Sequence, residues 1–210
     1  MRRAMIALLA LGLVLGTTLV ATGRARSETG SSSGDKALIR WDLIRIGGNI
    51  ILAGGRDVST DAATSDAITI TGSGHAEPGE KEAAGGGTFV HRHKDGTLVA
   101  QGAYHVTGFI SWQRLTGGSF AGTGLIDGIA NGTGATPDEQ EETSGVLTLA
   151  AEFVPLVKGE PQPGVQGTII VNCDLPGTSG TAEEGVEVQV PSLDLDFTQT
   201  SGNTLLHLLD

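Results

Sequence analysis

The sequence predicts an all-β fold, a single antiparallel domain of about ten strands in which a barrel is favoured over a two-sheet sandwich. From residue 37 onward, no long segment has convincing helical periodicity. Short apolar or alternating runs recur instead, separated by Gly, Pro, Asn, Asp or Thr. Glycines inside several of these runs, among them Gly102, Gly108, Gly122 and Gly124, suit the coiling that closes a barrel.

Each expected strand is recognised by side chains that alternate between two faces. The first is Ala37–Ile46, where Ile39, Trp41 and Leu43 share one face. The others, in chain order, are Asn49–Ala53, Ala67–Thr71, Thr88–His93, Thr97–Gln113, Phe120–Ile126, Val146–Phe153, Gly167–Cys173, Val186–Val190, Leu193–Phe197 and Thr204–Leu209. In the strand Thr97–Gln113, strict alternation places Val106, Gly108, Ile110 and Trp112 on one face.

The first residues predict export. Arg2 and Arg3 precede an apolar run, and small residues follow it, which is the layout of a secretory signal peptide. Cleavage is expected after Gly23 or Ser27, and the expected location is secreted or periplasmic. Residues 1–27 are then the signal peptide, residues 28–36 a flexible tether and residues 37–210 the all-β domain. The alternative is a membrane anchor, for which the apolar run of about 17 residues is short.

Charge and cysteine content narrow the expected partners. Loss of residues 1–27 removes four basic residues and leaves nine against 24 acidic ones, a net charge of −15. This charge argues against nucleic acid and against anionic membrane surfaces as partners. Cys173, the single cysteine, cannot form an intrachain disulfide and is expected to be buried as a small hydrophobic residue. The oligomeric state is left open.

The stretch from Gly85 to Trp112 predicts a β-hairpin. Lys94-Asp95-Gly96 suits a three-residue connection, a type I turn followed by Gly96 in the left-handed conformation. In this register His91 lies opposite Val99, and His91 and His93 share a face with His105. A two-residue Asp95-Gly96 turn is the alternative, and it puts His105 on the other face.

His91 and His93 are the candidate metal ligands. Two residues apart on one strand face, they lie about 7 Å from each other, close enough to bind one divalent metal ion together. His105 lies about 20 Å farther along the strand, so a third ligand must come from elsewhere. The nearest candidates in the sequence are His75, Glu77, Glu80 and Glu82. The other interpretation is an exposed polar face near the hairpin tip.

Gly85, five residues and then His91-Arg92-His93 resemble the opening of the first cupin motif. Cupins are small β-barrels that often hold a metal through such histidines, and many are enzymes. The resemblance therefore implies a metal-dependent enzyme that uses His91 and His93. The glutamate of the motif is absent, since Thr97 and Leu98 stand at its place, and the second motif is not found.

The preferred expectation is a non-enzymatic β-domain without a resident cofactor. No combination of nucleophile, base and acid that would define a catalytic site can be assembled from the sequence. The leader and the all-β pattern favour a secreted domain that binds a small apolar ligand inside the barrel, or a partner at its surface. The cupin-like metal-dependent enzyme is the alternative.

Overall fold

A computed structural model of the chain describes residues 37–129, 141–180 and 183–209. The predicted signal peptide and tether, and most of the loop from Ile129 to Gly145, lie outside these residues. Strands make up 66% of the structure and helix 2%, so the all-β prediction is confirmed. Among the described residues, no helix is long and apolar enough to cross a membrane.

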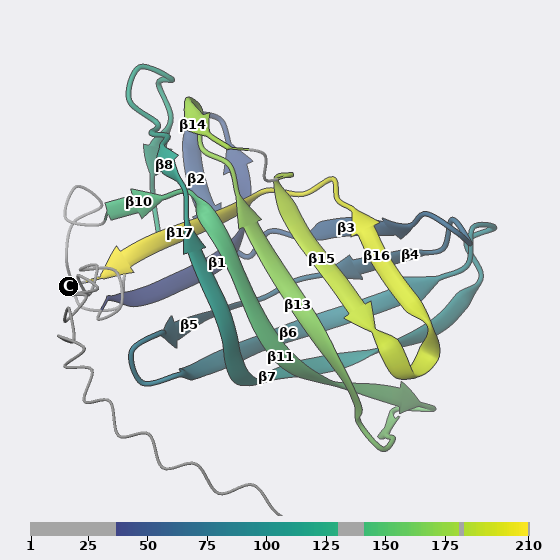
Figure 1. Ribbon diagram of the computed structural model, residues 1–210. Helices are drawn as coiled ribbons and strands as arrows, with labels where there is room; N and C mark the ends of the chain where they lie inside the picture. Colours follow the sequence, from purple (N-terminus) through teal and green to yellow (C-terminus); the bar gives the residue numbers. More distant parts are fainter. Residues whose placement is uncertain (1–36, 130–140, 181–182, 210) are drawn as a thin grey trace, which may run out of the picture. The chain divides into compact units, whose positions relative to one another are not determined.

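Eight antiparallel strands close into a barrel, as predicted (Figure 1). Each is hydrogen-bonded to the next barrel strand along the chain, and the last closes on the first through Phe197 and Asp61. The barrel strands are β3 (Asp57–Asp61), β4 (Ala67–Ile70), β6 (Glu82–Arg92), β7 (Leu98–Arg114), β11 (Gly145–Val157), β13 (Val165–Cys173), β15 (Gly185–Val190) and β16 (Leu195–Gln199).

A second group of strands extends the sheet beyond the barrel. β6 belongs to both parts, because Phe89–Arg92 pairs with β4 while Glu82–Gly86 pairs with the added strands. We call these strands the added layer. In order of pairing they are β5 (Ser73–Glu77), β1 (Leu38–Gly47), β17 (Thr204–Leu209) and β10 (Glu141–Thr143). The remaining short elements are β2 (Ile50–Ala53), β8 (Thr116–Gly117), β9 (Ile126–Asp127), β12 (Glu160–Pro161), β14 (Thr178–Ser179) and the 3-10 turn η3 (Pro191–Leu193).

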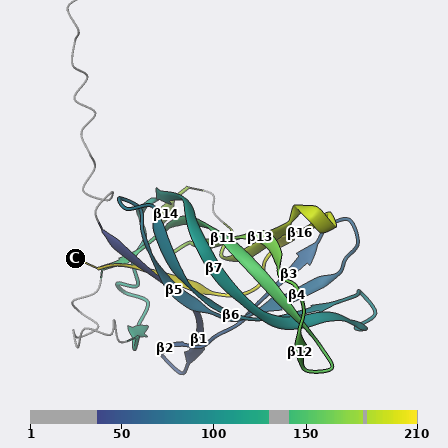
Figure 2. The same cartoon turned by 90° about the horizontal axis from the view of Figure 1, so that it is seen from below.

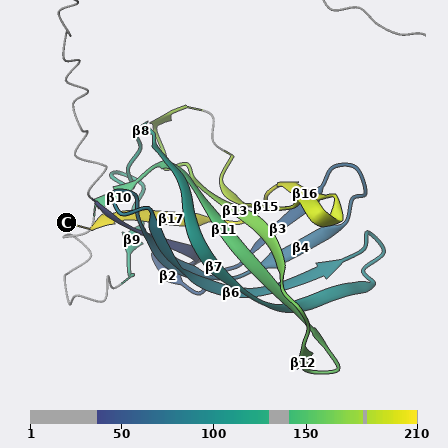
Figure 3. The same ribbon diagram turned by 60° about the horizontal axis from the view of Figure 1, so that its bottom comes forward.

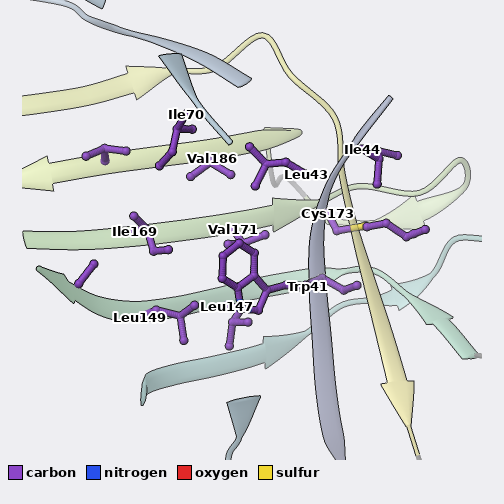
Figure 4. Close-up of a cluster of buried hydrophobic side chains, with 14 of the residues drawn as sticks. Trp41, Leu43, Ile44, Ile70, Leu147, Leu149, Ile169, Val171, Cys173 and Val186 are labelled. Atoms are coloured by element: carbon purple, nitrogen blue, oxygen red, sulfur yellow. The ribbon is translucent and has the colours of Figure 1, made fainter. Parts of the chain in front are cut away.

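The added layer covers one end of the barrel. Figure 4 shows Trp41 of β1 pointing toward Leu147 and Val171 of the barrel wall, and all three side chains are fully buried. β17 starts beside the end of β13, where the Thr204 hydroxyl donates a hydrogen bond to the Asn172 carbonyl, at 2.5 Å. We call the end of the barrel that the added layer covers the closed end.

Trp41 packs directly on backbone at the closed end. A Cβ at Gly74 would lie 2.8 Å from Trp41 Nε1, and a Cβ at Gly85 would lie 3.0 Å from Trp41 Cζ2. Such distances are too short for an added methyl group, so the indole occupies space that only glycine leaves free. Gly85, in the glycine run before the histidines, therefore lets the first half of β6 lie against the indole.

One predicted strand does not form, and two five-residue strands, β3 and β5, were not predicted. The predicted strand Phe120–Ile126 is turn and loop up to Leu125, and only Ile126 is in a strand, the short β9, because Gly122 and Gly124 adopt φ values of 80° and 76°. β3 escaped prediction since its buried residues are polar, namely Asp57, Ser59 and Asp61. β5, largely exposed, was also missed.

Irregularities in β7 change which of its side chains face the core. Leu149 pairs with Phe109 and Thr148 with Ser111. Ile110 is therefore a bulge residue without a partner in β11, and it is 51% exposed. A second irregularity passes over Thr107. Ile110 therefore does not share the inner face with Val106, contrary to strict alternation, because each extra residue reverses the faces beyond it.

Candidate functional site

The end opposite Trp41 is covered only by the connections between strands. The β3–β4 turn, the β6–β7 hairpin and η3 all lie at this end, at the right of Figure 2 and Figure 3. The hairpin around β12 also leaves the barrel here. We call it the open end, and it contains both predicted metal ligands.

The turn that carries the two histidines has the predicted form. The His93 amide donates to the Thr97 carbonyl at 2.9 Å and the Gly96 amide donates to the His93 carbonyl at 2.8 Å. Gly96 has a φ of 87°, in the left-handed region. Lys94-Asp95-Gly96 is therefore the three-residue connection expected from the sequence.

The register predicted beyond this turn is wrong by one residue. Arg92 pairs with Leu98 but His91 pairs with Ala100, so Val99 is an unpaired bulge residue. The bulge reverses the faces of β7 beyond it. His91 therefore shares the inner face with Ala100 and Tyr104, while His105 is exposed on the outer face.

The open end brings His91 and His93 together around Asp66. His93 Nδ1 lies 2.9 Å from Asp66 Oδ2 and makes a hydrogen bond with it, while His91 Nε2 lies 3.5 Å from the same oxygen. The Lys94 amide donates to Asp66 Oδ1 at 3.2 Å. The ring centres of the two histidines are 6.3 Å apart. One carboxylate thus contacts both histidines and the turn residue that follows them.

Asp66 is the functional residue that sequence reasoning missed. The proposed third ligands His75, Glu77, Glu80 and Glu82 lie in β5 and around its turn into β6, where His75 pairs with Ala84, seven residues before His91. The sequence offered one indirect signal. Asp66 lies two residues before Ile68, and Ile68 pairs with His91 in the sheet. That signal requires the β4–β6 pairing to be known.

Metal binding by His91 and His93 stays a prediction. Within the residues that the structure describes, no group of three His, Cys, Asp or Glu side chains is arranged to hold a metal ion. Asp66 faces both rings, yet its oxygens are already used by His93 and by the Lys94 amide.

A cavity of about 60 Å³ lies inside the barrel beside His91. Ten of its eleven lining residues are apolar, and three of them are phenylalanines. The lining residues are Ile68, Phe89, His91, Ala100, Phe153, Pro155, Val165, Val190, Leu193, Leu195 and Phe197. Leu193 of η3 is 56% exposed, so the cavity reaches the surface at this turn.

His91 is the single polar group in that wall. Its side chain is 9% exposed, and its ring meets the Phe197 ring edge to face at a centroid distance of 5.1 Å. Burial lowers the pKa of His91, although the charge of Asp66 acts in the opposite direction. The pKa of Asp66 is lowered, chiefly by its hydrogen bond with His93. His91 is therefore a neutral ring beside an ionised carboxylate at neutral pH.

A second histidine–carboxylate pair lies at the closed end. His207 Nε2 is 2.6 Å from Asp127 Oδ2, and the His207 side chain has no exposed surface. Asp127 also accepts a hydrogen bond from the Ile129 amide at 2.9 Å. Asp127 lines an open pocket of about 370 Å³ together with Phe120 and Leu125, whereas His207 is not among the residues that line this pocket. The environment of His207 is that of a structural pair.

Comparisons with protein-family models, with curated proteins and with solved structures give no match for this chain. The order of its strands also bears on the cupin resemblance. Cupins are jelly rolls built from Greek keys, whereas these barrel strands follow one another along the chain. The resemblance around His91 and His93 therefore does not extend to the connectivity of the fold.

Proposed function

We propose that the protein is a secreted or periplasmic binding protein that holds a small, mainly apolar ligand in the open end of its barrel. The observation that carries the proposal is the apolar cavity beside His91. Eight-stranded barrels have an interior that side chains just fill, or that holds one small ligand. Here the closed end is filled by Trp41 and the open end is not.

The volume of the cavity limits the size of the ligand. A single water needs at least about 10–15 Å³ when volume is measured this way, so 60 Å³ accommodates only a few heavy atoms. Long acyl chains and multi-ring compounds do not fit inside. A single ring or a short branched chain enters the cavity only in part, and the rest of the molecule lies over the exposed Leu193.

The composition of the wall favours binding over catalysis. Apart from His91, the wall offers no group that could act as a nucleophile or an acid. Aromatic and aliphatic side chains with few polar groups are typical of sites that recognise ligands by shape and burial. The three phenylalanine rings in the wall suit a planar ligand.

The test compares two variants of one strand. Ala100 lines the cavity, whereas Ala103 lies three residues along β7 on the outer face. Thermal unfolding of the mature protein is measured with a panel of monocyclic aromatic and branched aliphatic compounds. We expect stabilisation of the wild type and of Ala103→Leu, and none of Ala100→Leu, whose side chain fills the cavity. Absence of stabilisation in the wild type across the panel would contradict the proposal.

A second candidate function is metal-dependent chemistry at His91 and His93. It is favoured by the carboxylate of Asp66, which lies within 3.5 Å of a nitrogen from each ring. Protein purified without an affinity tag is analysed for transition metals beside the double variant His91→Ala, His93→Ala. Stoichiometric metal in the wild type and its loss in the variant would support this function. Equal trace metal in both would exclude it.

A further inference from the structure

The contacts of His91 determine where its ring carries a proton. Asp66 Oδ2 lies 3.5 Å from His91 Nε2 and already accepts a hydrogen bond from His93. A lone pair on Nε2 would face the carboxylate and be repelled, whereas an N–H at this position is attracted. The neutral ring therefore carries its proton on Nε2, which leaves Nδ1 as a hydrogen-bond acceptor.

Nδ1 is the nitrogen that a bound molecule can reach. It has no hydrogen-bond partner among the described residues. Nε2 is fully buried, whereas Nδ1 is not. His91 lines the cavity, and every other lining residue is apolar. A ligand that covers this acceptor removes it from water, so a ligand that donates a hydrogen bond to it is favoured over one that leaves it unpaired.

We propose that the ligand carries a hydroxyl group that donates a hydrogen bond to Nδ1 of His91, which makes phenols and small cyclic alcohols the preferred class. This inference rests on the proposed function. Asp66 and His93 act as positioning residues, because they fix the tautomer of His91 without contact with the ligand.

The test uses phenol and toluene, which differ by a hydroxyl in place of a methyl group. Their dissociation constants are measured by NMR titration with the wild type and with His91→Leu. The different hydration of the two probes is the same for both proteins, so it cancels when the ratio of the two constants is compared between them. We expect the preference for phenol to fall by about three- to tenfold in His91→Leu, while toluene affinity changes little. His105→Leu, which replaces an exposed histidine on the outer face of β7, should leave the ratio unchanged.

The same ratio measured against pH in the wild type requires no substitution in the barrel. Protonation of His91 turns Nδ1 from an acceptor into a donor, so phenol affinity should fall in acid while toluene affinity holds. The ionisable groups facing His91 are Asp66, His93 and Asp61. Both carboxyls have lowered pKa values, Asp61 chiefly through the Thr64 amide, and so stay ionised. Repeating the titration with His93→Gln removes the contribution that protonation of His93 makes to the pH dependence.

The outcomes separate the inference from the function on which it rests. If neither probe binds, the proposed binding function fails and the inference fails with it. If both probes bind with a ratio that responds neither to His91→Leu nor to pH, the cavity binds ligands but His91 does not select them, which overturns the inference alone. A phenol preference that rises in acid would make His91 a donor and would also overturn it.

Discussion

At one end of the barrel Trp41 fills the interior, whereas at the other end a cavity of about 60 Å³ remains. Each end also has a buried histidine beside an aspartate. At the closed end His207 and Asp127 are 2.6 Å apart with no exposed surface on the histidine. At the open end His91 and Asp66 are 3.5 Å apart, and the His91 side chain makes no hydrogen bond with a described residue.

The difference follows from what covers each end. The layer of β5, β1, β17 and β10 lies over the closed end and supplies side chains that complete the packing. Only turns cover the open end, and turns supply few apolar groups; Leu193 is 56% exposed. The same barrel is thus filled at one end and keeps a cavity at the other, and substitutions at the two ends should separate their contributions to stability.

The largest expected effect is at the closed end. Trp41→Ala removes a fully buried indole from a site where glycine backbone packs against it, so the surroundings cannot easily collapse. We expect a loss of about 3–5 kcal/mol in the free energy of unfolding, measured by urea denaturation. Leu193→Ala at the open end, where the side chain is mostly exposed, should change it by less than about 0.5 kcal/mol. Equal losses would mean that the ends are not distinct in packing.

A smaller effect separates the two histidine–carboxylate pairs. Asp127→Ala leaves His207 Nε2 buried without its partner and also removes the acceptor of the Ile129 amide. We expect a loss of about 1–3 kcal/mol in the free energy of unfolding. Asp66→Ala should cost less than about 1 kcal/mol, because the His93 side chain that it frees is 56% exposed and can turn to water. A larger cost at Asp66 would show that the open end is also built for stability.

Much of the fold could be predicted from the sequence, because most barrel strands alternate apolar and polar residues. The inward series Leu147, Leu149, Ala151 and Phe153 is one example, and all four are buried as the pattern requires. Cys173 is likewise buried, as expected. β3 could not be recognised in this way, since the groups it places inward are carboxylates and a hydroxyl that bind backbone amides and carbonyls.

The site was harder to predict than the fold, for two physical reasons. The bulge at Val99 shifts the register by one residue, and nothing in the local pattern distinguishes it from regular alternation. The partner of both histidines, Asp66, comes from the start of β4 through a pairing between strands that are not adjacent in the sequence. The turn at Gly96 was predictable because its chemistry is local, whereas contacts between strands are not.

The smallest effect expected at the open end is a dependence of stability on pH that comes from His91. Burial lowers its pKa in the folded state below the ordinary value of about 6.5, so between these two values the unfolded chain binds more protons than the folded one. The free energy of unfolding therefore falls as the pH is lowered from about 6.5 until it passes the folded pKa. Asp61 and Asp66, with lowered pKa values, lose their contribution only in stronger acid.

Two buried carboxyls change the free energy of unfolding in the opposite direction as the pH falls. A comparison between the wild type and a variant is therefore needed to isolate the effect of His91. Burial raises the pKa of Glu184 and of Glu187, and such groups gain stability as the pH falls through their folded pKa values. Urea unfolding from pH 7 to pH 5 is therefore compared between the wild type and His91→Leu. The wild type should lose more stability than the variant over this interval, because a leucine side chain has no site that binds a proton. Identical pH profiles would mean that folding leaves the proton affinity of His91 unchanged, and that the open end does not hold its histidine away from water.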